Sequence, residues 1–228
     1  MRERKKFNNL PKTPSLEFEN KHWVQFSSIA GLDEAGRGAW AGPVSAAAVV
    51  LPQIPKLEQT LSGVKDSKLM IPKQRDFWAG VIKTVAITWG IGFSTASEID
   101  EMGIIAATRL AMQRALSQLN PQPQFLLIDA LVLPAVKLPQ EALIKGDQRC
   151  LSIAAASVLA KTARDAHMCT QDQLYPNFGF SSHKGYGTKR HQLALTTNGP
   201  SPIHRKSFKP IQILNTLYQN TDFNDYSD

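Results

Sequence analysis

Acidic residues close three of the short apolar runs in this chain. The acids are Asp33 and Glu34 after residues 29–32, Asp129 after 125–128, and Asp147 shortly after 142–144. Such runs predict buried β-strands, and a carboxylate beside a core is costly unless it is paired or holds a metal ion. A single acid of this kind is typical of a turn or a helix cap. Three strand ends with the same feature favour a functional site at one edge of a sheet.

The type of side chain indicates which ion such a site would hold. Carboxylates without nearby Cys or His ligands suit hard cations, Mg²⁺ or Mn²⁺. About four of them can hold two ions roughly 4 Å apart, an arrangement that cleaves phosphodiesters. Asp33 and Glu34 are adjacent and would point to opposite faces of a regular strand. We therefore expect the strand to end or bulge there, with Gly36 allowing the turn.

The order of strand and helix patterns predicts the fold class. Strands are expected at residues 29–32, 44–51, 85–94, 125–128 and 142–144, and helices at 104–119, 152–172 and 188–197, with further helix starts at Pro72 and Ser97. The first two strands are close enough in sequence to form a hairpin. This order predicts an α/β or α+β arrangement with one mixed sheet.

Composition limits the classes of protein to consider. The chain has 228 residues, enough for one sizeable core, and 26 basic against 19 acidic residues give it a net charge of +7. A basic protein of this size favours a polyanionic partner, with nucleic acid first. Two cysteines form neither a disulfide framework nor a zinc motif, so we expect a reducing, cytoplasmic location. No apolar run is long enough to span a bilayer, and a monomer is expected.

The positive charge is concentrated in two segments. Residues 1–27 are predicted to be a basic, flexible leader, with a non-specific phosphate-binding arm as the alternative. Residues 181–210 carry six Lys or Arg, no acid and three of the five histidines, which favours a phosphate-tracking surface. Tyr186 lies between glycines in this segment. It could stack on a base or sugar, or pack on the domain.

Two short polar motifs leave alternatives open. The sequence Gly36-Arg37-Gly38 exposes a backbone that a nucleotide can approach closely, and Arg37 can reach a phosphate, but the motif alone also suits a tight turn. The cluster Asp66-Ser67-Lys68 could bind a phosphate or form a turn, and its spacing does not decide between them.

Five motifs together resemble ribonuclease HII, the type 2 ribonucleases H, from about residue 29 to 210. They are GLDEAGRGAWAGPVSAAAVVL, KDSKL, FLLIDA, IKGDQRCLSIAAASVLAKTARD and YPNFGFSSHKGYGTKRHQLALTTNGPSPIHRKSF. The resemblance implies a ribonuclease H-like fold: a central mixed five-stranded sheet flanked by helices, with a helical C-terminal region. The catalytic domain would cover residues 28–210, followed by a tail at 211–228.

The resemblance also implies an activity. It is endonucleolytic hydrolysis of the RNA strand of RNA–DNA hybrids, and cleavage on the 5′ side of ribonucleotides embedded in duplex DNA, leaving 5′-phosphate and 3′-hydroxyl ends. Two Mn²⁺ or Mg²⁺ ions would be bound by Asp33, Glu34, Asp129 and Asp147. The backbone of Gly36, Arg37 and Gly38 would recognise the 2′-hydroxyl, and Tyr186 would stack on the following deoxyribose. Phosphate contacts would come from Ser67, Lys68, His183 and Lys184.

Some positions depart from the family pattern or stay unassigned. Ala130 stands where the family usually has glycine, and KDSKLM has one lysine after its serine where many relatives have two. We expect Asp165 to bond nearby backbone or an arginine rather than a metal, and His22 and His167 to be structural.

Two further classes compete with the nuclease. A non-catalytic nucleic-acid-binding module would suit the basic segment, but it gains nothing from four acids that face phosphates. A small-molecule phosphohydrolase would explain the acids but not the basic C-terminal surface. The related ribonuclease HIII carries a large N-terminal substrate-binding domain, for which we expect the 27-residue leader to be too short.

Overall fold

The structure is a computed structural model that describes residues 10–11 and 13–221, and its centre is one mixed sheet of five strands. The strands are β1 (Ile29–Ala35), β2 (Val44–Val50), β3 (Thr88–Ser94), β4 (Phe125–Asp129) and β5 (Gln140–Leu143). Their order across the sheet is β3-β2-β1-β4-β5. β2 is antiparallel to both β1 and β3, whereas β1, β4 and β5 are parallel. The predicted mixed five-stranded α/β sheet and its first hairpin are confirmed.

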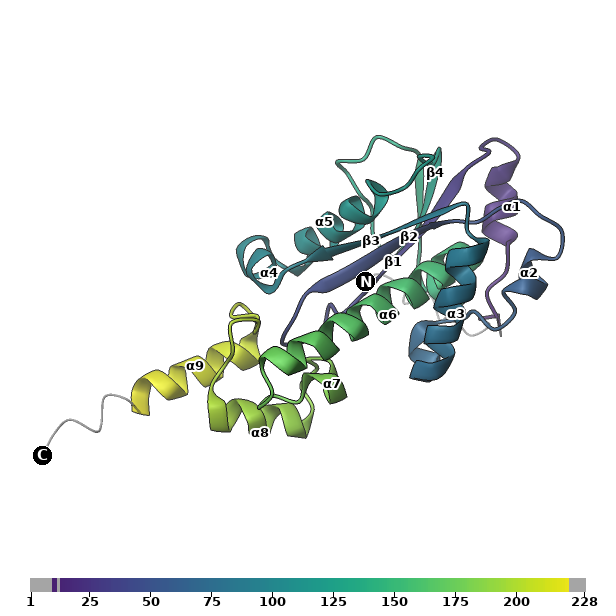
Figure 1. Cartoon of the computed structure of the whole chain (residues 1–228). Coiled ribbons are helices and arrows are strands. Elements are labelled where there is room, and N and C mark those ends of the chain that lie inside the picture. Colours follow the sequence, from purple (N-terminus) through teal and green to yellow (C-terminus); the bar gives the residue numbers. More distant parts are fainter. Residues whose placement is uncertain (1–9, 12, 222–228) are drawn as a thin grey trace, which may run out of the picture.

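Helices cover both faces of the sheet and extend beyond one end of it (Figure 1). They are α1 (Glu17–Trp23), α2 (Leu57–Thr60), α3 (Pro72–Val85), α4 (Ala96–Met102), α5 (Ile104–Leu116), α6 (Leu151–Leu174), α7 (Phe180–His183), α8 (Lys189–Asn198) and α9 (Lys209–Thr221). In Figure 1, α4 and α5 lie on one side of the sheet and α3 and α6 on the other, while α7, α8 and α9 gather at the far end of α6. The expected helical C-terminal region is present.

β2 is buried on both faces, which explains why apolar and polar residues do not alternate along it. Ala47 and Val49 pack into the core under α3 and α6, and Ala48 and Val50 pack into the core under α5. A strand buried on both faces needs a continuous apolar run, which VSAAAVV supplies. In the neighbouring strand, a Cβ on Gly31 would lie 2.2 Å from the backbone of Ser152, so glycine lets α6 approach β1 closely.

Several predicted boundaries are wrong by a few residues. β1 does not end at Leu32 but runs to Ala35, and Asp33 and Glu34 pair with Ala47 and Ala46 of β2. The apolar run marks where the strand is buried, whereas the backbone pairing continues as long as β2 runs beside it. Similarly, Val85 belongs to α3 rather than to the third strand.

The described part of the predicted leader is structured. Helix α1 packs with Leu16 and Trp23 in the core, Ser15 forms a bridge with Cys150, and the buried Glu19 accepts a hydrogen bond of 2.6 Å from the Ser152 N–H. The prediction of a flexible leader is therefore wrong for this part, because it was based on the net charge of the segment, which does not show these contacts. Residues 1–9 and 12 lie outside the described residues.

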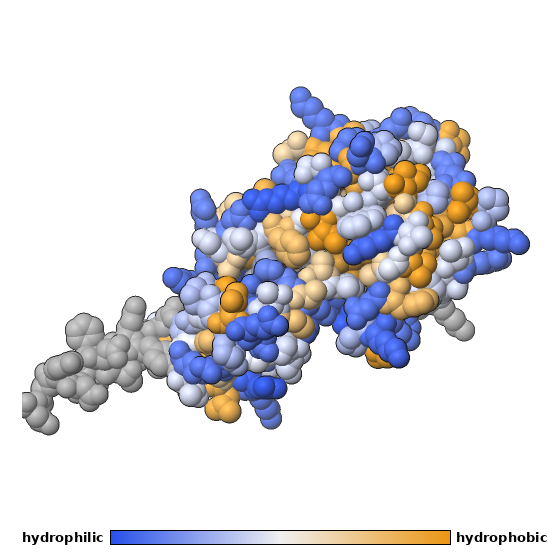
Figure 2. Space-filling model, in the orientation of Figure 1, coloured by the Kyte–Doolittle hydropathy of each residue, from blue (hydrophilic) through white to orange (hydrophobic). Residues whose placement is uncertain are grey.

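The C-terminal helix of the structure also extends past the domain boundary predicted at residue 210. The predicted tail begins at residue 211, yet α9 crosses this point and buries Ile211. Residues 222–228 are not among those described. No helix in the described ranges is both long and apolar enough to cross a membrane. On the face drawn in Figure 2, hydrophobic residues form patches that hydrophilic residues interrupt.

Candidate active site

The four predicted acids lie at one edge of the sheet. Asp33 and Glu34 come from β1, Asp129 ends the neighbouring strand β4, and Asp147 lies in the 3₁₀ turn that follows β5. Because these three strands are parallel and adjacent, their carboxyl ends meet at the same edge. Asp33 and Asp147 are only 3% and 5% exposed.

The acids are close enough to alter one another's pKa. Burial, followed by the charges of Glu34, Asp129 and Asp147, raises the pKa of Asp33 well above its usual range. Burial, followed by the charges of Asp66 and Asp129, raises the pKa of Asp147 to about 6. Burial also raises the pKa values of Glu34 and Asp129. Buried carboxylates that repel one another favour binding of positive charge.

Two basic side chains lie beside the cluster. Arg37 Nη1 is 3.2 Å from Glu34 Oε1, so in this structure Arg37, predicted to reach a phosphate, pairs with an acid. Lys68 Nζ is 3.8 Å from Asp147 Oδ2. Burial lowers the pKa of Lys68, but the charges of Asp66 and Asp33 outweigh it and the pKa rises. These cations compensate the acids only in part.

The donor set fits a hard divalent cation. It consists of carboxylate oxygens, and Glu34 Oε2 is buried with no hydrogen-bond partner among the described residues. Two other oxygens are engaged: Asp33 Oδ1 accepts from the Glu34 N–H and Asp129 Oδ1 from the Gly146 N–H, each at 2.7 Å. In the described part of the chain, no three His, Cys, Asp or Glu side chains converge as ligands of one ion. The acids are therefore neighbours rather than a preformed cage.

The Gly36-Arg37-Gly38 loop shares a cavity of about 280 Å³ with Glu34, Ser67, Lys68 and Tyr186. Thus the structure brings together motifs that are far apart in the sequence. Gly36 has a φ of +94°, and a Cβ on it would lie 1.9 Å from Arg164 Nε. Gly38 differs, because a Cβ on it would meet no atom within 4 Å. Gly36 is therefore required by the fold, while Gly38 leaves room in the cavity.

Two fully buried arginines, which sequence reasoning missed, donate hydrogen bonds to backbone carbonyl groups of this loop and of the residues that follow it. Arg164 donates to the carbonyl oxygens of Pro43, Ala41 and Lys184 at 2.8, 3.1 and 2.9 Å. Arg205 donates to those of Gly42, Arg37 and Gly36 at 3.0, 2.8 and 2.7 Å. Burial, followed by the nearby charge of Arg164, lowers the pKa of Arg205 to about 9. No sequence signal distinguishes these arginines from surface ones.

Tyr186 lines the cavity and is 36% exposed, so its ring is accessible. The Lys161 Nζ and the Arg164 guanidinium carbon lie 5.7 and 5.4 Å from the ring centroid. Its carbonyl oxygen accepts a hydrogen bond of 3.1 Å from His191 Nδ1. The backbone of Tyr186 is thus fixed while its ring remains available.

The predicted phosphate contacts divide into two groups. Lys68 has a side chain that is 77% exposed, and the Lys184 Nζ lies 3.1 Å from Cys169 Sγ near the surface. By contrast, Ser67 is buried and its hydroxyl bonds that of Ser157 at 2.9 Å.

The contacts of His183 do not support the prediction that its side chain binds a phosphate. Its Nε2 donates to the Phe178 carbonyl oxygen at 2.8 Å, and its Nδ1 accepts from the Gly185 N–H at 3.2 Å. Because both ring nitrogens are engaged, the side chain supports the loop instead of offering a donor to a phosphate. The basic composition of the segment could not reveal this.

Three further positions near the site are Asp66, Asp165 and Ala130. Asp66 is 5% exposed and adds a fifth acid near the cluster, which the strand-end signal missed because no apolar run precedes it. Asp165 bonds Arg75 at 3.1 Å, which confirms the arginine partner expected for it. Ala130, the departure from the family's glycine, has a φ of +53°, in the region that glycine adopts more easily.

Comparisons with known proteins agree with this arrangement. The sequence model of the family described as Ribonuclease HII matches residues 30–211. The Ribonuclease HII of Chloroflexus aurantiacus is 50% identical over 87% of this chain and 94% of its own length. That of Dehalococcoides mccartyi is 47% identical over 85% and 92%. The crystal structure of the ribonuclease H2 from Pyrococcus horikoshii superposes with a TM-score of 0.71 at 27% identity and covers 84% of this chain and 99% of that one. The chain therefore belongs to the ribonuclease HII family of metal-dependent ribonucleases, hydrolases that act on the phosphodiester bonds of RNA in RNA–DNA hybrids.

Proposed function

We propose that this enzyme, besides cleaving RNA in hybrids, cuts on the 5′ side of single ribonucleotides embedded in duplex DNA. The observation that carries the proposal is the cavity in which Glu34 lies beside the Gly36-Arg37-Gly38 backbone and Tyr186. Glu34 supplies a carboxylate to this cavity, and the glycines of the loop leave part of its backbone uncovered by side chains. The 2′-hydroxyl is the group that separates RNA from DNA, and a backbone free of large side chains can approach it.

The chemistry assigned to the acids is two-ion phosphodiester hydrolysis. Asp33, Glu34, Asp129 and Asp147 would hold two Mg²⁺ or Mn²⁺ ions, which when bound activate water and stabilise the leaving oxygen. The chain's own residues prepare the site. The Gly146 N–H orients Asp129, the Glu34 N–H orients Asp33, and Arg37 fixes one oxygen of Glu34 while the other stays unpartnered among the described residues.

Selection of an RNA-to-DNA step is assigned to the loop and the tyrosine together. The backbone of residues 36–38 would bind the 2′-hydroxyl, and the exposed ring of Tyr186 would stack on the deoxyribose that follows. Lys68 and Lys184 would contact phosphates. Hydrolysis would leave a 5′-phosphate and a 3′-hydroxyl. The enzyme is proposed to act as a monomer.

The first test uses an end-labelled DNA duplex with one ribonucleotide, incubated with Mn²⁺, Mg²⁺ or EDTA beside an all-DNA duplex. The expected result is a metal-dependent cut on the 5′ side of the ribonucleotide with the control intact. The variant Asp129→Asn is expected to fold and to be inactive. Glu101→Gln, at an exposed acid of α4, is the matched control and should cut normally.

The competing nucleic-acid-binding module gives a different result in the same assay. It would hold the duplex equally well with Mn²⁺ or EDTA and would leave it uncut. Full activity of Asp129→Asn would reject the assignment of this acid to the metals.

A further inference from the structure

Lys161 and Tyr186 form the wall between two cavities. The first is the cavity of about 280 Å³ at the Gly36-Arg37-Gly38 loop. The second has a volume of about 540 Å³ and lies between α3, α6 and α7, with Arg75 and Asp165 among its lining residues. Because Lys161 and Tyr186 line both, a nucleic-acid strand that continues from the first cavity into the second passes these two side chains.

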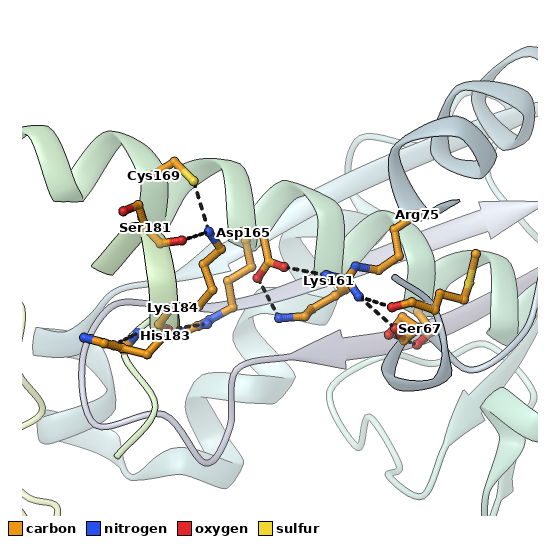
Figure 3. A network of polar contacts seen from close by, with 12 residues as sticks. Ser67, Arg75, Lys161, Asp165, Cys169, Ser181, His183 and Lys184 are labelled. Carbon is orange, nitrogen blue, oxygen red and sulfur yellow. Dashed lines mark hydrogen bonds and ion pairs between the residues drawn. The ribbon is translucent and has the colours of Figure 1, made fainter. Parts of the chain in front are cut away.

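The ammonium group of Lys161 is held in place from one side. Its Nζ donates to Asp165 Oδ1 at 2.6 Å, and Asp165 Oδ2 accepts from Arg75 Nη2 at 3.1 Å. Figure 3 shows Asp165 between the two basic side chains, with Arg75 continuing to the Ser67 segment. An ammonium group has three N–H donors, and in the described part of the chain Lys161 uses one of them, on Asp165.

This wall carries more positive than negative charge. Among the residues that the structure describes, Asp165 is the one carboxylate that contacts both Arg75 and Lys161, and all three side chains are at most 15% exposed. Arg164, fully buried nearby, donates three hydrogen bonds to backbone carbonyl groups of the described residues rather than to an acid. Burial lowers the pKa of Lys161, and the charges of Arg75 and Arg164 add to this effect while Asp165 opposes it. A buried surplus of positive charge favours an anionic ligand at the cavity surface.

The position of Lys161 identifies one phosphate of the substrate. Its Nζ lies 5.7 Å from the centroid of the Tyr186 ring and faces the cavity of the Gly36-Arg37-Gly38 loop. If the ribonucleotide contacts the loop and the next sugar stacks on Tyr186, the phosphate between these two nucleotides lies beside Lys161. We propose that Lys161 donates a hydrogen bond to the phosphate that joins the ribonucleotide to the deoxynucleotide on its 3′ side, with Asp165 as its positioning residue. This inference rests on the proposed function.

The test combines a change in the protein with a change in that one phosphate. The single-ribonucleotide duplex is made with a neutral methylphosphonate at this linkage, and its affinity is measured by fluorescence anisotropy in EDTA. For the wild type, we expect binding to weaken by roughly tenfold, as for loss of one charge-assisted hydrogen bond. Lys161→Met should weaken binding of the unmodified duplex by a similar factor. Since the contact is then already lost, the methylphosphonate should change binding to this variant by less than about twofold.

Matched variants separate the contact from general effects. Lys83→Met removes one positive charge from an exposed position of α3 that carries a cation–π contact with Trp89, and it should retain wild-type affinity and methylphosphonate sensitivity. Lys161→Arg should restore much of the affinity that Lys161→Met loses. Asp165→Asn keeps the lysine but not its orienting charge, and it should reduce the methylphosphonate effect without removing it. Thermal unfolding of each variant checks that the fold is retained.

Two results would overturn the proposal: a methylphosphonate that leaves wild-type affinity unchanged, or a Lys161→Met variant as sensitive to it as the wild type. Cleavage of the unmodified duplex with Mn²⁺ is scored separately. If cleavage fails while the binding pattern holds, the proposed function falls and the phosphate contact stands. If cleavage occurs without the binding pattern, the proposed function stands and the phosphate contact is rejected.

Discussion

The guanidinium of Arg205 donates a hydrogen bond of 2.7 Å to the carbonyl oxygen of Gly36, 169 positions earlier in the chain. The same group also bonds the carbonyl oxygens of Arg37 and Gly42. Since the carbonyl groups of the loop are occupied on its inner side, its backbone is fixed against the C-terminal region. The Gly36-Arg37-Gly38 loop is therefore fixed to residues 181–210, the segment that also carries Tyr186.

Replacement of Arg205 by lysine is expected to destabilise the protein by about 2–4 kcal/mol. A lysine cannot reach all three carbonyl oxygens, and each buried acceptor left unpaired costs roughly 1–3 kcal/mol. The free energy of unfolding in urea checks this. Arg109→Lys, at an arginine with one bond to the Val132 carbonyl oxygen, is the control and should lose less than about 1 kcal/mol. Equal losses in the two variants would show that the three contacts of Arg205 stabilise the protein no more than the one bond of Arg109 does.

The two glycines of the loop should respond differently to alanine. Gly36→Ala forces a side chain into a positive-φ position and against Arg164, which should cost about 2–4 kcal/mol. Gly38→Ala places its methyl group in open space and should change stability by less than about 1 kcal/mol. It should nevertheless slow cleavage of the single-ribonucleotide duplex, since the methyl group enters the cavity. Thermal unfolding and initial rates measured together test the contrast, which fails if both variants unfold alike.

Two buried, neutral histidines make stability depend on pH. His204 Nε2 donates to His191 Nε2 at 2.9 Å, and burial, followed by the neighbouring histidine charges, lowers the pKa of His204 to about 3 and that of His191 to about 4. The unfolded chain therefore takes up protons first as the pH falls below about 6.5. Stability should fall between pH 6.5 and 4 by about 1.4 kcal/mol per pH unit for each histidine. In His204→Gln this slope should be smaller by at least one histidine's share, and an unchanged slope would contradict the prediction.

Asp147 should show the opposite dependence. Its pKa is about 6 in the folded protein, above the usual 3.8, so the unfolded chain loses its proton first and stability falls as the pH rises from about 4 to 6. Because Lys68 and solvent screen the charge, Asp147→Asn should be more stable than the wild type by about 1–2 kcal/mol at pH 7 without metal. The variant should lose cleavage and most of the stabilisation that Mn²⁺ gives the wild type. Thermal unfolding with and without Mn²⁺ measures this, and a less stable variant without metal would refute the repulsion.

Local sequence patterns predicted much of the fold and part of the site. The apolar runs predicted all five strands, and the acids that follow them, Asp33, Glu34, Asp129 and Asp147, lie at one edge of the sheet as expected. Where the predictions failed, the cause was an interaction with a distant segment. β1 extends past Leu32 because β2 pairs with it, and α1 forms because Leu16 and Trp23 find a core made by other elements. The assignment of His183 to the substrate is not supported, because its backbone partners could not be known from composition.

The sequence by itself determined the kind of chemistry: oxygen ligands, a glycine-lined loop and a basic surface are properties of residue types and their spacing. Only the tertiary structure decided which of these groups meet. It placed Asp66 as a fifth acid, directed Arg205 to the carbonyl group of Gly36 and Arg164 to that of Pro43, and set Lys161 beside Tyr186. The physical reason is that local sequence does not distinguish an arginine on the surface from one that is buried against distant carbonyl groups. The roles of Arg164 and Arg205 depend on contacts made across more than a hundred positions of the chain, which no local pattern contains.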